Sequence, residues 1–330
     1  MTNSNEKFDF EPWDTSVYTG LEKSIGPDGM IHFCVYNEEK YKYAQIYNKR
    51  HFSDDSHYAP YLVYLIGKKM GIDVPETELK ACLIPDMETG LYRDAFYQSS
   101  LVYLNGIERE PFFNRQISFF PFSVIKSYYY DSMNKTENQD RYDAVDDYIN
   151  ANMHYFSTRQ KTPMTEEQIA EIKQRLIDNL MFGLKLGIRG ESDVIESKYD
   201  NPRLNSFYLT SSNMLCLNLR TSKASELAKE KTSDLKQFAD REFPVQYSVS
   251  GDKKSSVEDV VKYLYDNYPV EAEKSYNKLK QFGTYSLKTV LDDFSEMDEV
   301  HKKLALKLFS IRQKELYDIH KAYEEKKVIR

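Results

Sequence analysis

Few side chains of this 330-residue chain have the type and spacing of a catalytic or metal-binding group. Glu191, Asp193 and Asp200 follow an expected helix, and a carboxylate near a reacting hydroxyl can act as a general base. His32 and Cys34 fall on one face of an expected strand, and both residue types ligate metals. The simpler interpretation is a solvated acidic loop for the first set and two structural residues for the second.

Motifs of other enzyme classes are not found in the sequence. There is no HExxH, GxSxG, Walker A or GxGxxG pattern. His57 and His154 lie in polar surroundings and indicate no catalytic triad. The candidate groups are therefore the carboxylates and the His32–Cys34 pair named above, and their positions depend on the secondary structure around them.

The first hundred residues predict strands and one helix. Alternating apolar residues predict a hairpin of two strands, Met30–Tyr36 and Tyr41–Tyr47, joined by a polar link. A helix is expected from Tyr58 to Met70, with Pro60 in its first turn and Gly71 directly after its end. Further strand-like pieces are Leu79–Leu83, Leu91–Tyr97 and Leu101–Leu104.

From about residue 105 the pattern becomes helical. Pro111–Tyr130 is strongly aromatic but has no clear period, so it remains unassigned. Ser/Thr-x-x-Glu/Gln pairs mark helix starts because each side chain bonds the other's backbone N–H. The expected helices are Arg141–Phe156, one that starts at Thr165 with Gln168 and ends at Gly187, one that starts at Ser255 with Glu258, and Glu296–Lys326.

Four separated segments of the chain resemble the HipA-like serine/threonine kinases of bacteria, the CtkA type in particular. They are Gly20–Gly29 with the following hairpin, Ala59–Thr77, Asp178–Gly187 and Ser295–Lys303. The resemblance implies an α+β, two-lobed kinase-like fold. We expect a small β-rich N-lobe with one helix in residues 1–105 and a larger, mostly helical C-lobe in residues 106–330.

The same resemblance implies that the chemical positions of the kinase have been emptied. The nucleotide lysine, its glutamate partner, the catalytic aspartate and the metal-binding aspartate fall at Gln45, Pro60, Gly190 and Asn218. In phosphoryl transfer such groups supply positioning and charge, which is nearly all of the catalysis. Glutamine, proline, glycine and asparagine supply no charge.

Two shifted alignments remain open. A one-residue shift would place Ile46 at the lysine position, where there is again no lysine. A three-residue insertion would give Asp193 the role of the catalytic aspartate, with Asn201 as the metal-binding asparagine. Arg220 takes the place of a glycine after Asn218, where it either fills the space of a missing metal or faces solvent.

Composition limits the partners and the compartment. The formal net charge is −7, from 52 acidic and 45 basic residues, so nucleic acid is not expected as a direct partner. Cys34, Cys82 and Cys216 are far apart, which is typical of a reduced cytoplasmic protein. The sequence shows neither a signal peptide nor an apolar run near the ~20 residues that a membrane helix requires.

These observations predict a bacterial, cytoplasmic pseudokinase that binds and regulates a protein partner through the aromatic region 111–130. Gln45 and Asn218 are its degenerate nucleotide and metal positions. We expect no cofactor and no metal site. If the protein has retained nucleotide binding, the expected ligands are ATP and magnesium. One alternative is an active, divergent serine/threonine kinase with Asp193 as its base. Another is an unrelated two-domain scaffold or inhibitor.

Overall fold

The computed structural model describes most of the chain, in segments. These are residues 11–12, 21–25, 31–36, 41–48, 58–74, 76–85, 92–102, 117–120, 122–134, 142–160, 162–197, 203–209, 221–242, 247–295 and 297–329. For the strands, the course and pairing of the backbone are described.

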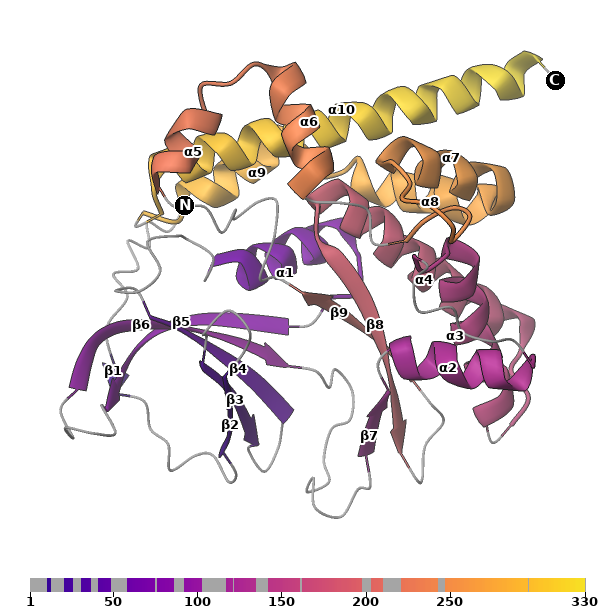
Figure 1. The fold of residues 1–330 in the computed structure, drawn as a ribbon, viewed down its shortest axis with the longest axis horizontal. Helices are drawn as coiled ribbons and strands as arrows, with labels where there is room; N and C mark the ends of the chain where they lie inside the picture. The colour runs from indigo at the N-terminus through magenta and orange to yellow at the C-terminus, as the bar shows by residue number, and fades with distance from the viewer. Residues whose placement is uncertain are drawn as a thin grey trace.

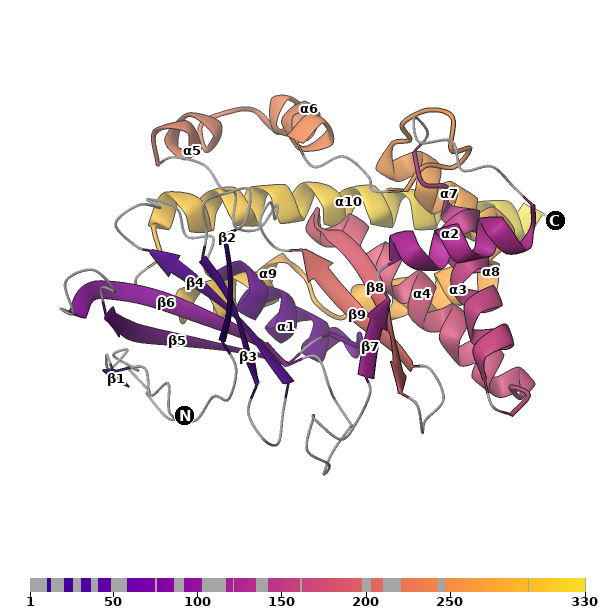
Figure 2. The same cartoon turned by 60° about the horizontal axis from the view of Figure 1, so that its bottom comes forward.

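Residues 11–102 build a six-stranded sheet in the order β1-β5-β6-β4-β3-β2 (Figures 1 and 2). β1 runs parallel to β5, and the other neighbours are antiparallel. The strands are β1 (Glu11–Pro12), β2 (Leu21–Ile25), β3 (Ile31–Tyr36), β4 (Tyr41–Asn48), β5 (Glu76–Pro85) and β6 (Tyr92–Val102).

The expected hairpin is β3 and β4, paired from Ile31 opposite Ile46 to Tyr36 opposite Tyr41. The two pieces expected at 91–97 and 101–104 are one continuous strand, β6, which pairs with β5 on one side and β4 on the other. Pairing on both edges satisfies the backbone through the polar Gln98-Ser99-Ser100 stretch, where local alternation is lost.

Helix α1 (Ala59–Met70) joins the sheet to the helices. Its proline lies in the first turn, and Gly71 closes it in the left-handed conformation (φ 67°), as the sequence predicts. The helix packs on β5 and β6. On its other side the Tyr58 ring lies 4.8 Å from the ring of Phe294, which follows α9 (Thr284–Asp292).

A second, three-stranded antiparallel sheet lies within the part expected to be mostly helical. It consists of β7 (Ile117–Phe120), β8 (Arg189–Ser197) and β9 (Arg203–Leu209), with β8 in the middle. This part is largely helical, as expected, but the sheet was not predicted. The reason is that β7 lies far upstream of its partner β8, and such a pairing leaves no signal in local periodicity.

The remaining helices surround a shared core. α10 contacts α4, α5, α6, α7 and α9, so it connects most of the helical part (Figure 2). The helices not yet given are α2 (Phe122–Ser132), α3 (Val145–Arg159), α4 (Glu166–Leu186), α5 (Thr221–Leu227), α6 (Thr232–Glu242), α7 (Val257–Asn267), α8 (Pro269–Leu279) and α10 (Glu299–Ile329).

Helix starts follow the predicted capping chemistry closely. Thr165 and Gln168 form the capping box of α4, with bonds of 3.2 and 3.0 Å. The box expected at Ser255 is one residue later, at Ser256 with Asp259. Ser255 instead accepts a hydrogen bond from the backbone of Val249, so its side chain holds the preceding turn.

None of the described helices is both long and apolar enough to cross a membrane. The domain boundary predicted at residue 105 falls among residues 103–116, which lie outside the described residues, so it stays a prediction.

Candidate functional site

The positions expected to have carried kinase chemistry fall on separate elements. Gln45 lies on β4, where its backbone is opposite His32 on one side and Ser99 on the other. Pro60 lies in the first turn of α1. Gly190 lies on β8, in the second sheet. Asn218 lies outside the described residues, as do Asn201, Asp200 and Arg220.

The segment after α4 is a strand, which corrects the loop expected there. Gly187 closes α4 with φ 62°, and β8 already begins at Arg189. The backbone of Gly190 is opposite Tyr208, and that of Asp193 is opposite Asn205. Asp193 therefore does not lie on an acidic loop but in the central strand of a sheet.

Asp178, at the start of the resembling segment, is a buried anchor between helices. Its carboxylate accepts hydrogen bonds from Ser275 (2.6 Å), Lys278 (2.5 Å) and Gln174 (3.0 Å). Ser275 and Lys278 lie on α8, so the network fastens α8 to α4. A buried carboxylate needs such partners, because an unpaired charge is costly to bury.

Lys185, one residue before the last of α4, holds the other end of α8. Its ammonium donates to the backbone oxygens of Leu279 (2.5 Å) and Phe282 (2.7 Å), and it lies 5.0 Å from the ring centre of Phe309. Leu279 is the last residue of α8, and Phe282 follows three residues later. Carbonyl groups at a helix C-terminus lack partners within the helix. Burial lowers the pKa of Lys185 to about 7. Asp178 and Lys185 together hold the C-terminal half of α4 against α8 and the residues after it, and so help to position the start of β8.

The sequence reasoning missed Lys185. A signal was present, because Asp178 and Lys185 are seven positions apart and flank the largely apolar last two turns of the helix. Charged residues at that spacing share a helix face. Both are buried, with 3% and 1% of their surface exposed.

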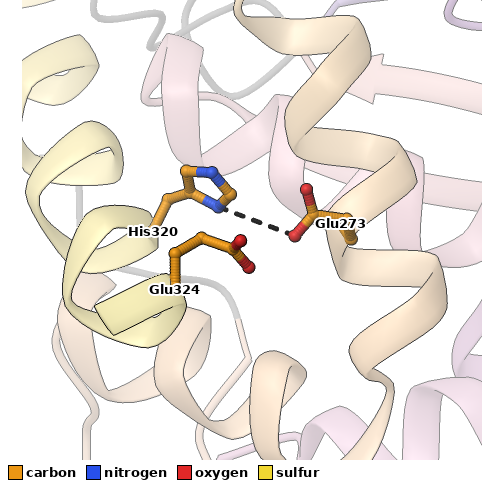
Figure 3. A group of neighbouring side chains, drawn as sticks. All are labelled: Glu273, His320 and Glu324. Carbon is orange, nitrogen blue, oxygen red and sulfur yellow. Dashed lines mark ion pairs between the residues drawn. The ribbon is translucent and has the colours of Figure 1, made fainter. Parts of the chain in front are cut away.

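Glu273, His320 and Glu324 form a cluster with the composition of a metal site (Figure 3). Glu273 comes from α8, and the other two are one turn apart on α10. One ligand atom from each lies within 4.8 Å of the others, and His320 Nδ1 is 3.8 Å from Glu273 Oε2. Two carboxylates and an imidazole can ligate a divalent ion.

Neighbouring groups already occupy this cluster. Tyr265 O–H lies 2.9 Å from His320 Nδ1, and the ammonium of Lys327 lies 2.8 Å from Glu324 and 3.7 Å from Glu273. The hydrogen bond that Lys327 donates to Glu324 raises the pKa of Lys327, so this positive charge is stable. These ion pairs connect α8 to α10. The expectation of no metal site stays a prediction.

Comparison with known proteins gives a fold. No protein-family model and no curated protein matches the chain. The chain is similar to the crystal structure of a Helicobacter pylori proinflammatory kinase, CtkA, with a TM-score of 0.58 and 14% identity over 92% of this chain and 96% of that one. A chain of the Shewanella oneidensis MR-1 complex of HipA, HipB and operator DNA gives a TM-score of 0.48 and 8% identity, over 96% of this chain and 70% of that one.

The likeness to CtkA extends over nearly the whole chain and shows a kinase-like, largely helical fold. The predicted resemblance to HipA- and CtkA-like kinases is thereby confirmed at the level of the fold.

Proposed function

We propose that this kinase-like chain is a non-catalytic member of its fold that acts by binding a protein partner. In this proposal residues 11–102, with their sheet and α1, form the N-lobe, and the helical remainder forms the C-lobe. The observation that carries it is the joint loss of charge at Gln45, Pro60 and Gly190 on elements that the fold retains.

The local structure supports the loss of the lysine–glutamate pair. α1 contains no acidic residue at all, and proline occupies its first turn. β4 has one lysine, Lys42, but it is three positions from Gln45, and residues an odd number apart in a strand belong to opposite faces. Without that pair and its nearby acids, the electrostatic part of phosphoryl transfer is missing.

Exposed side chains on α2 and α3 and directly beside these helices, called here the α2–α3 surface, support the binding role. Tyr128, Met133 and Tyr142 are large side chains with 38%, 50% and 49% of their surface exposed. Arg159 lies 5.1 Å above the Tyr128 ring. Tyrosine, methionine and arginine are the residue types enriched at protein interfaces. Tyr128 belongs to the aromatic region 111–130 from which a partner contact was predicted, and we assign the partner to this surface.

A thermal-shift titration with ATP and magnesium tests the non-catalytic half of the proposal. We expect a shift within about 1 °C at millimolar nucleotide, because a ligand below its dissociation constant adds less than about 0.4 kcal/mol. A large magnesium-dependent stabilisation, with label from ATP appearing on protein, would contradict it. Asp193→Ala then identifies the base: loss of that transfer would establish the divergent kinase instead.

The binding half is tested with the exposed side chains themselves. The double variant Tyr128→Ser/Met133→Ser should reduce co-purification of a partner from the native host at least tenfold, because interface aromatics carry much of the binding energy. Tyr285→Ser is the matched control, since Tyr285 is 83% exposed on α9. Equal loss in both variants, or in neither, would remove the α2–α3 surface from the proposal.

A further inference from the structure

A cavity of about 460 Å³ lies among α4, α8, α9 and α10, and none of the predicted kinase positions lines it. Its volume is within the range of small-molecule pockets. The polar side chains on its wall are Lys185, Lys280, Thr284, Ser310, Gln313 and Lys314.

The wall carries positive charge only. Three of the lining residues are lysines and none is a carboxylate, although the whole chain has a net charge of −7. Among the described residues, neither Lys280 nor Lys314 has a side-chain hydrogen bond or an ion pair. Lys314 also borders a neighbouring cavity with Glu315 and Asp318, yet no ion pair forms there. Two ammonium groups are thus available to an anion.

The third lysine is held in place at the wall. Lys185 is 1% exposed and directs two of its three N–H bonds to Leu279 O and Phe282 O. One N–H donor remains beyond these two bonds. A bound anion would favour the ammonium form, and burial is the influence that lowers the pKa of this lysine.

The neutral polar groups of the wall also present donors. The backbone N–H and the hydroxyl of Thr284 both donate to Gln313 Oε1, at 3.1 and 3.0 Å. This fixes the amide of Gln313 with its oxygen occupied and its NH₂ group free to donate. Ser310, on the exposed side of α10, adds a hydroxyl. The cavity therefore offers the Gln313 NH₂ group and the Ser310 hydroxyl as further donors, and the Gln313 oxygen is already occupied.

We propose that this cavity binds a phosphate monoester dianion. Such a group carries about −1.5 to −2 charges at neutral pH and three strong acceptor oxygens. It is the complement of the two available ammonium groups, the remaining donor of Lys185 and an amide. The rings of Tyr276 and Tyr317 also line the cavity and can contact the carrier of the phosphate. That carrier is either a small metabolite or a phosphorylated side chain of another protein. The proposal is independent of the non-catalytic role, because no residue is shared.

Isothermal titration of the full chain at low salt tests it with three probes: inorganic phosphate, O-phosphotyrosine, and a phosphotyrosine peptide beside its unphosphorylated form. The test variant is Lys280→Gln/Lys314→Gln. Its control, Lys274→Gln/Lys321→Gln, removes the same charge from exposed positions of the same helical region that do not line the cavity. We expect the phosphate-bearing probes to bind and the test variant to weaken binding roughly tenfold or more, with the control within about twofold.

Some outcomes identify the carrier of the phosphate group, and others contradict phosphate binding by the cavity. Tighter binding of the phosphopeptide than of phosphotyrosine identifies a phosphorylated protein, and equal binding identifies a small ester. Absence of binding by every phosphate probe at 10 mM overturns the proposal. So does equal weakening in the two double variants, since that is the result of diffuse surface charge. Circular dichroism and melting temperature establish that the variants fold.

Discussion

At the scale of single residues, the most unusual environment among the described residues is that of Lys185. A lysine that is 1% exposed loses hydration, which disfavours its charge, while two carbonyl oxygens at 2.5 and 2.7 Å favour it. The balance of these effects can be measured as a pH dependence of stability, because the pKa of a lysine in the unfolded chain is near its ordinary value.

Burial lowers the pKa of Lys185 from 10.5 to about 7. Between these two values the unfolded chain binds more protons than the folded chain, so stability should rise as pH rises from 7 towards 9. We expect this residue to add up to about 2 kcal/mol over that interval. Urea unfolding at pH 7 and pH 9 checks it, with Lys185→Met as the variant that lacks the gain.

If the two proteins show the same pH slope, the carbonyls hold Lys185 charged and its pKa is not lowered in the folded chain. Tyr263 and Tyr265 do not obscure the comparison, because burial raises the pKa of each above the ordinary value of about 10.

The sequence identified candidate residues better than it identified their surroundings. Gln45, Pro60 and Gly190 could be named because a resemblance depends on order along the chain. The environment of Asp193 could not, because it depends on the pairing of β8 with β7 and β9. Lys280 and Lys314 were not found for the same reason: helix packing brings them to one cavity with Lys185.

At the scale of elements, helices with a strong period and a clear cap were predicted almost to the residue. α4 starts and ends as expected because Thr165, Gln168 and Gly187 act locally. α5 and α6 were missed, since they are short and lie on a small core with few apolar positions of their own. The sequence therefore predicted the helices whose ends are determined by residues close to them in the chain.

The contact between α4 and α8 contains a buried carboxylate with three partners, so its loss should be costly. Asp178→Ala should lower the free energy of unfolding by about 3 kcal/mol, because Ser275 and Gln174 lose a buried acceptor and Lys278 loses its ion pair. Denaturant unfolding at pH 7 measures it. Asp292→Ala, which breaks an exposed pair with Lys288, is the control and should have no measurable effect. A loss as small as that of the control would mean that the network contributes nothing net.

At the scale of the whole molecule, the described residues form two hydrophobic cores of unequal size. The larger one includes α1, α3, α4, α7, α8 and one face of α10. The smaller one joins Leu235 and Phe238 of α6 to Leu304 and Leu308 of α10. In Figure 2, α5 and α6 lie on the side of α10 opposite the six-stranded sheet.

Polar contacts reinforce this smaller attachment. Arg312 donates to Asp240 of α6 at 2.7 Å and to Glu315 at 2.8 Å, and Lys236 pairs with both acids. Among the described residues, the stronger contacts of α5 and α6 with other helices are all with α10. These two helices, the α5–α6 unit, should open without unfolding of the larger core.

Hydrogen exchange tests this partition directly. Leu235→Ala removes a side chain that is 1% exposed from the smaller core, and it should speed exchange in residues 221–242 while α4, α7 and α8 stay protected. Leu264→Ala in the larger core is the matched control and should destabilise the whole chain by about 2–5 kcal/mol, with faster exchange throughout. If Leu235→Ala speeds exchange equally in every helix, the two cores open as one cooperative unit and the α5–α6 unit has no independent stability.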